Sequence, residues 1–219
     1  MKKIIFTFLV SSLISGISFG QKDYGSELDA TVAIPTGANS KYFNVGYGVT
    51  GGFYYTLESD WRLGLTLGFI RIGVDGKEIN NYFQTLGQQG NIDLKGSVSI
   101  IPILFSGKYI FPAASGTYAV IEGGLYTFWS KVNGNIIYSG TNPGTVSIDE
   151  SEFSSEPGFA LGMGSLFRVN QEISIDVSIK YNFVRNSGAI KINDRTGEKS
   201  FGSSHFFNIA IGANWNFDL

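Results

Sequence analysis

The sequence predicts an all-β fold: an eight-stranded antiparallel transmembrane β-barrel with short periplasmic turns and long extracellular loops. Three observations predict it. The N-terminus has an export signal, eight segments alternate between apolar and polar residues, and the links between these segments alternate in length.

The N-terminus has the three parts of a secretory signal peptide. Lys2 and Lys3 form a short basic region, residues 4–17 are almost wholly apolar or small, and Ser18-Phe19-Gly20 places small residues at the −3 and −1 positions. The apolar run is shorter than the roughly 20 residues that a membrane-spanning helix needs. We therefore expect a signal peptide at 1–20 with cleavage after Gly20, a barrel domain at 21–219, and the outer membrane as the destination.

Composition narrows the class of protein. Charged residues make up 16 % of the chain, against roughly 25 % in soluble domains. Aromatic residues reach 15 % and there are 29 glycines. The net charge of −2 gives no electrostatic attraction to nucleic acid. The chain has no cysteine and one histidine. This composition excludes a disulfide scaffold and disfavours a transition-metal site, so we expect no metal and no cofactor.

Eight segments alternate with a period of two, which is the period of a β-strand. In the most regular of them, Ile175, Val177 and Ile179 alternate with Asp176 and Ser178. One face of each segment is rich in aliphatic and aromatic residues, and the other face is mainly Gly, Ser, Thr and Asn. The predicted strands cover residues 25–34, 45–57, 61–74, 94–111, 117–130, 158–168, 173–183 and 206–219.

The links between these strands alternate between short and long. The short polar links are 58–60, 112–116 and 169–172; the longer links, rich in Gly, Asn, Ser, Thr and Asp, are 35–44, 75–93, 132–155 and 186–204. Short turns at the periplasmic end and longer loops outside are typical of a barrel in the outer membrane.

The composition of the two faces favours a membrane barrel over a soluble one. A soluble barrel needs many charges on its outward face, whereas the polar face here is mostly small and uncharged, which suits a narrow interior. A closed ring also leaves no unpaired strand edge in lipid. Aromatic residues are expected to form two interfacial belts, with Trp61 and Tyr118 near the short turns and Trp129 near the long loops. Pro102 lacks a backbone donor, so the fourth strand should be distorted there.

Several motifs resemble the outer-membrane protein β-barrel domain family, which includes small eight-stranded barrels of the outer-membrane protein A and X type. The motifs are IIPIL at 100–104 with KYIFP at 108–112, YAVIEGGLY at 118–126, IDVSIKYN at 175–182 and the closing strand at 211–217. The resemblance implies insertion by the outer-membrane assembly machinery, which recognises the last strand. Trp215, Phe217 and Leu219 keep the alternation of such an assembly signal, with Leu219 where the family usually ends in an aromatic residue.

Eight charged residues of mixed sign fall on the predicted inner face: Glu27, Asp29, Arg62, Lys108, Glu122, Arg168, Asp176 and Lys180. They could line a conduit for ions or pair with one another to plug the lumen. The interior of an eight-stranded barrel is just wide enough for side chains, and buried charges need partners, so the plug is favoured. We therefore predict a monomeric, non-enzymatic structural or surface-interaction protein that contacts outer-membrane lipid. A small porin-like channel or a small-ligand-binding barrel is the alternative.

A lipid-modifying enzyme is the third hypothesis. Small barrel acyltransferases use His, Asp and Ser residues from their outer loops, and the one histidine, His205, lies near Asp194, Ser203 and Ser204 in the sequence. A single histidine in a polar loop is more often a solvated or interfacial residue, so no catalytic residue is predicted.

Overall fold

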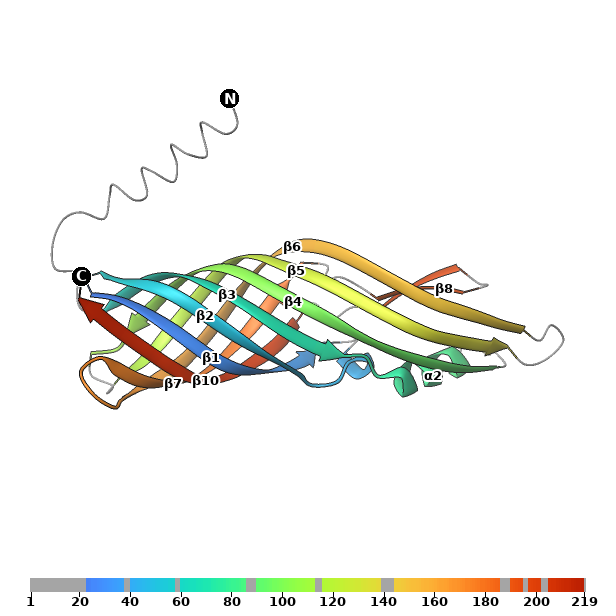
Figure 1. Cartoon of the computed structure of the whole chain (residues 1–219), viewed down its shortest axis with the longest axis horizontal. Helices are drawn as coiled ribbons and strands as arrows, with labels where there is room; N and C mark the ends of the chain where they lie inside the picture. Colours follow the sequence, from blue (N-terminus) through green and yellow to red (C-terminus); the bar gives the residue numbers. More distant parts are fainter. Residues whose placement is uncertain are drawn as a thin grey trace, which may run out of the picture.

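Eight antiparallel strands close into a ring in the order β1-β10-β7-β6-β5-β4-β3-β2 (Figure 1), which confirms the predicted fold class. The structure is a computed structural model, and it describes residues 23–37, 40–57, 60–85, 90–112, 116–138, 144–185, 190–194, 197–201 and 205–218 of the 219-residue chain. The predicted signal peptide and its cleavage site lie outside these residues. The barrel strands are β1 (Asp23–Thr36), β2 (Gly46–Leu57), β3 (Trp61–Gly73), β4 (Gly90–Ile110), β5 (Thr117–Tyr138), β6 (Gly144–Arg168), β7 (Ile173–Val184) and β10 (His205–Asp218).

The ring closes where the first strand meets the last. β1 pairs with β10 from Asp23↔Asp218 to Thr36↔His205, and its other edge pairs with β2. Each remaining neighbour in the ring is the next barrel strand along the chain, so the topology is a simple meander. The short link between β4 and β5 ends at Gly116, whose positive φ of 86° suits a glycine.

Pro102 interrupts one of the two ladders of β4. Pairing with β3 runs from Trp61↔Tyr109 to Leu67↔Ile103 and resumes at Ile70↔Ile100 in the same register. On the other side, Pro102 keeps its place opposite Tyr126 of β5. The distortion predicted from the missing donor is therefore confirmed as a local break on one side.

Two of the predicted long links differ from expectation. Residues 132–155 do not form an open loop: β5 continues to Tyr138 and β6 starts at Gly144, and the two strands stay paired to the end. Residues 75–93 contain helix α2 (Gly76–Thr85) and the first residues of β4. Figure 1 shows β4, β5 and β6 running beyond the other strands with α2 beside them. We call this outer part, β4 to β6 beyond the barrel together with α2, the extension.

The apolar side of the sheet reverses at the start of the extension. Within the barrel, Ile121 and Leu125 of β5 are exposed outward, and Glu122 is buried. Further along the same strand, Val132 and Ile136 are buried inward, and Lys131, Asn133 and Asn135 are exposed. The strand thus presents apolar side chains to the outside of the barrel first, and polar side chains to the outside afterwards. Because of this reversal, the sequence pattern alone indicates a loop where the strand in fact continues.

Helix α2 covers the inner face of the extension. Asp75 caps it by accepting hydrogen bonds from the backbone N–H groups of Lys77 at 3.0 Å and Glu78 at 3.3 Å. Ile79 and Phe83 are buried in a cluster that also contains Leu94 and Val132. Two smaller elements lie in the remaining long links: the 3₁₀ turn η1 (Ser40–Tyr42), and a hairpin of β8 (Ile190–Asp194) and β9 (Gly197–Phe201). In the part of the chain described here, no helix is both long and apolar enough to cross a membrane.

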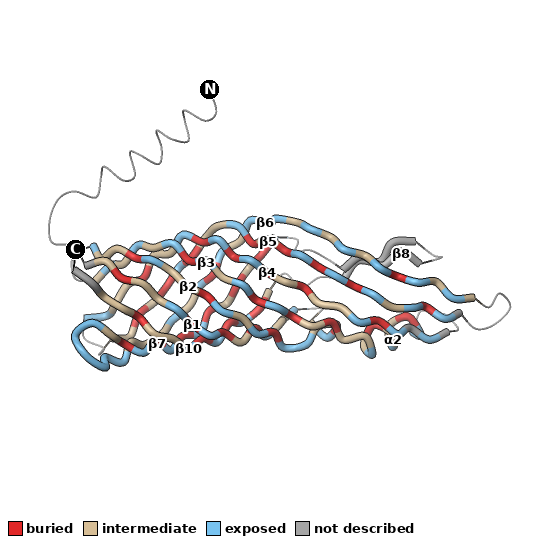
Figure 2. The backbone as a smooth tube through the Cα atoms, in the orientation of Figure 1, coloured by how far each residue is buried: buried red, intermediate tan, exposed pale blue. Residues whose placement is uncertain are grey.

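The barrel interior has two layers. On several strands, the inward residues nearest the short turns are polar, and apolar ones follow: on β3, Arg62 and Thr66 precede Ile70. The same order holds on β7, where Asp176 and Lys180 precede Val184. Figure 2 shows the alternation of buried and exposed residues that results along the strands. The apolar layer continues without a gap into the core of the extension.

Candidate functional site

The polar layer of the barrel interior is the candidate site, and Lys108 on β4 lies at its centre. Its ammonium group is 2.9 Å from Glu27 Oε2 and 3.4 Å from Asp176 Oδ2, and all three side chains are more than nine-tenths buried. Tyr118 donates a hydrogen bond of 2.7 Å to Asp176 Oδ1 and presents its ring to Lys108 Nζ at 4.3 Å. One cation from β4 is therefore held by two carboxylates, one on β1 and one on β7, which are separated in the ring only by β10.

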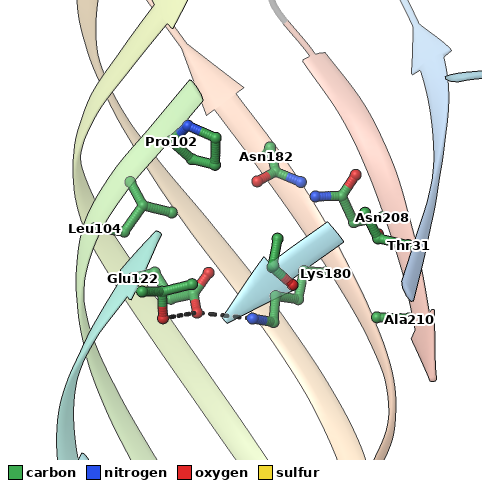
Figure 3. A pocket seen from close by; sticks show the side chains of 10 residues that line it. Thr31, Pro102, Leu104, Glu122, Lys180, Asn182, Asn208 and Ala210 are labelled. Atoms are coloured by element: carbon green, nitrogen blue, oxygen red, sulfur yellow. Dashed lines mark hydrogen bonds and ion pairs between the residues drawn. The ribbon is translucent and has the colours of Figure 1, made fainter. Parts of the chain in front are cut away.

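A second ion pair lies in the same polar layer, further from the short turns. Lys180 Nζ on β7 is 2.7 Å from Glu122 Oε1 on β5 (Figure 3), and the two strands are separated in the ring by β6. Thr66 on β3 donates to the same carboxylate at 3.5 Å. Asn182, next along the inner face of β7, accepts a hydrogen bond from Tyr126 at 2.9 Å and donates to the carbonyl of Phe206 at 3.2 Å.

Arg62 closes the polar layer near the short turns. Its guanidinium group lies 4.5 Å from the ring centre of Tyr54 and contacts the amide oxygens of Asn214 and Asn216, each at 3.4 Å. The hydroxyl of Tyr54 also lies at hydrogen-bond distance from both amide oxygens. These contacts join β2, β3 and β10 across the interior.

Seven of the eight charged residues singled out from the sequence lie in this layer. Glu27, Lys108, Asp176, Glu122 and Lys180 form the ion pairs. Arg62 is nearby, and Asp29 is buried beside Thr50, which donates to its Oδ2 at 3.5 Å. Arg168 differs, because it lies at the end of β6 and is exposed. Arg168 keeps the inward parity of β6, but it is the last residue of the strand, where the alternation of buried and exposed residues is lost, so the period alone did not show that it is exposed.

Two aromatic members of the layer, Tyr118 and Tyr126, were not predicted from the sequence. Tyr118 was expected in the lipid-facing belt, but it is buried and points to Asp176. Its position had the right signal: Tyr118 and Tyr126 share the even-numbered face of β5 with Glu122, and that face is inward. Trp61 and Trp129, the other two residues expected in the aromatic belts, are exposed as predicted.

A small cavity of about 20 Å³ separates the polar and apolar layers. Figure 3 shows Lys180, Asn182 and Asn208 on one side of it and Pro102 and Leu104 on the other. A cavity of this size holds about one water molecule and no larger ligand.

His205 is the first residue of β10, the last strand of the ring. The His205 ring stacks on Tyr181 at 6.0 Å and meets Phe183 edge-on at 5.4 Å, so it packs among aromatic rings. Ser203 and Ser204 lie outside the described residues, and Asp194 ends β8. In the predicted assembly signal, Trp215 pairs with Ser26 and Phe217 with Tyr24, whereas Leu219 lies outside the described residues.

The outer surface of the barrel is apolar over its whole girth. Leu63, Leu65 and Leu67 on β3, and the matching positions of the other barrel strands, are exposed. A continuous apolar surface of this extent is foreign to soluble monomers, which rarely expose patches of more than a few hundred Å². A closed antiparallel ring with a lipid-facing apolar band and a polar interior is the architecture of an integral outer-membrane β-barrel.

Comparison with solved structures agrees with this class. The chain resembles a major outer-membrane protein from Thermus thermophilus at 11 % identity and a TM-score of 0.51, and the match covers 90 % of this chain and 100 % of that one. It resembles the outer-membrane protein OprG from Pseudomonas aeruginosa at 12 % identity and a TM-score of 0.50, over 91 % of this chain and 97 % of that one. The attachment invasion locus protein Ail of Yersinia pestis matches at 13 % identity with a TM-score of 0.45, covering 90 % of this chain and 99 % of Ail.

No family model and no curated protein sequence matches the chain. The fold expected from the resemblance to small eight-stranded outer-membrane barrels is confirmed, and at these identities the likeness to solved structures extends to the fold alone.

Proposed function

We propose that this chain is a monomeric integral outer-membrane protein with a filled, non-conducting lumen, and that it acts through the surface that it presents outside the membrane. The observation that carries this proposal is the occupation of the lumen by two successive layers of side chains. Its location in the outer membrane is supported by the barrel architecture and by the export signal predicted at residues 1–20.

The polar layer supports a plug rather than a conduit. An ion path needs charges that face mobile water, but Lys108 and Lys180 are each held by buried carboxylates within 3.4 Å. Ile70, Ile100 and Phe128 are buried in the apolar layer above, where an ion would lose its hydration without compensation. The cavity that the described residues enclose between the layers is too small for a ligand, so this cavity does not support the ligand-binding alternative.

The extension supports a role at the cell surface. It continues β4, β5 and β6 beyond the barrel and has its own core around Ile79 and Phe83. Its outer face carries a side-chain network in which Asn133 donates to Asp149 at 2.9 Å and Trp129 donates to Ser151 at 3.0 Å. An ordered, polar and projecting sheet of this kind suits contact with other surface components.

Conductance of the refolded mature protein tests the proposal. Planar bilayers that contain the pure protein should show no single-channel steps, while the same preparation shows the heat-dependent gel shift of a folded barrel. Stable, reproducible steps at the frequency of insertion would overturn the plug and restore the channel alternative.

A further inference from the structure

Just outside the apolar band, the outward face of the sheet carries three exposed cations: Arg71 on β3, Lys95 on β4 and Lys131 on β5. We call them the cation cluster. Arg71 Nη2 donates to Ser97 Oγ at 3.1 Å, and Ser97 is the register partner of Lys131. The guanidinium group therefore lies over the strand that neighbours Lys131. None of the three cations forms an ion pair with a carboxylate among the described residues.

Aromatic neighbours place the cation cluster at the depth of the lipid headgroups. Tyr47 is the register partner of Arg71 and is 68 % exposed, and Trp129 lies two residues before Lys131 on the same face. Phe69, two residues before Arg71, still belongs to the apolar band. Because Trp and Tyr side chains prefer the membrane–water interface, the cations that follow them lie just beyond the hydrocarbon.

On this face of the sheet, the two charges nearest the apolar band are both positive. Asp93 and Asp149 also point outward. Asp149 lies at the register level of Lys95, with Asn133 between them, and accepts a hydrogen bond from Asn133. Asp93 lies two residues beyond Lys95 on β4, so Arg71 and Lys131 are nearer to the apolar band than either acid. The headgroup layer therefore meets an excess of positive charge.

We propose that the cation cluster binds the phosphate groups of phosphorylated lipids in the outer leaflet. This inference rests on the proposed function, because the long-loop end must face that leaflet. Arg71 has the planar fork that matches two phosphate oxygens, and Lys131 adds a compact charge beside it. The apolar band below holds the acyl chains of the same lipid, so that one molecule can contact both surfaces.

Lipid retention by the folded barrel tests the inference. The mature chain is inserted into phosphatidylcholine vesicles that contain a few mole per cent of bisphosphorylated lipid A. It is then extracted into mild detergent, and the lipid A bound per barrel is measured by native mass spectrometry across a titration. The variant R71Q/K131Q should bind lipid A about 25-fold more weakly, at about fivefold for each cation removed. The matched control K77Q/R168Q removes two exposed charges from other parts of the surface and should bind as the wild type does.

Three outcomes distinguish the sources of the phosphate and the two proposals. If millimolar inorganic phosphate displaces lipid A from the wild type, the cation cluster recognises free phosphate and the lipid assignment fails. If the wild type inserts, as judged by its gel shift, but retains no more lipid A than R71Q/K131Q does, the inference fails while the proposed function stands. If the wild type does not insert at all, the proposed function itself fails.

Discussion

Gly68 and Pro102 face one another where the ladder between β3 and β4 is interrupted. A Cβ atom on Gly68 would lie 3.0 Å from Pro102 Cγ, 2.7 Å from Thr50 Cγ2 and 3.1 Å from the carbonyl oxygen of Val49. The glycine leaves the room that the pyrrolidine ring occupies inside the barrel. The proline is thus tolerated in a closed ring because the strand beside it has no side chain at that level.

Gly68→Ala should destabilise the folded barrel by about 1–3 kcal/mol, the usual range for overpacking a tight interior. The matched control is Gly123→Ala, because no atom lies within 4 Å of a Cβ built on Gly123. The free energy of unfolding in urea, followed by tryptophan fluorescence in vesicles, measures both changes. An equal effect of the two substitutions would contradict the packing argument.

The Lys180–Glu122 pair should be strongly coupled. Lys180→Met or Glu122→Gln alone leaves a buried partner without its counter-charge or hydrogen bond, and the loss for Lys180→Met should reach about 3–5 kcal/mol. The double variant should be more stable than the sum of the two single losses indicates, because it leaves no unpaired charge. Unfolding free energies of all four proteins complete the cycle, and simple additivity would count against a direct interaction.

Tyr118→Phe removes the hydroxyl that donates to Asp176 at 2.7 Å and leaves the ring in place. A hydrogen bond to a charged group contributes about 1.5–3 kcal/mol, so the variant should lose stability in this range. Tyr47→Phe is the control, since its side chain is mostly exposed and no hydrogen bond of its hydroxyl is found among the described residues. A large loss of stability for Tyr47→Phe and none for Tyr118→Phe would contradict a stabilising hydrogen bond between Tyr118 and Asp176.

Phe83→Ala should loosen the extension without unfolding the barrel. Phe83 is 2 % exposed, and its removal leaves a cavity between α2 and the sheet. Hydrogen exchange should become faster in residues 76–85 and at the start of β4, while exchange in β7 and β10 stays unchanged. Lys77→Ala on the exposed side of α2 provides the comparison. Faster exchange throughout the barrel would show that the extension and the barrel form one cooperative unit.

The barrel could be predicted from the sequence because each strand has lipid on one side and a narrow polar interior on the other. Seven of the eight predicted interior charges lie in the lumen for that reason. The extension could not be predicted, because the odd-numbered positions of β5 change from apolar at Ile121 and Leu125 to polar at Asn133 and Asn135. The period stays at two, but the surroundings of the outer face change from lipid to water. A prediction that expects the same face of a strand to stay apolar therefore ends the strand at this boundary.

Pairings such as Lys108 with Asp176 were also beyond the sequence. Their residues lie on strands that are not neighbours, and contact across a lumen depends on side-chain length and on the closed shape of the ring. Period and parity give the face of a residue, but they do not give its height or its partner on the opposite wall.

The seam between β1 and β10 has a consequence for biogenesis. Since the second neighbour of β1 is β10, the last strand of the ring along the chain, β1 keeps a free edge that lipid cannot hydrate until β10 has paired with it. Stable insertion of the ring must therefore wait until β10 is in place. Loss of the final strand would leave a sheet whose apolar surface favours the membrane, but whose unpaired backbone groups on β1 and β7 could not be satisfied there.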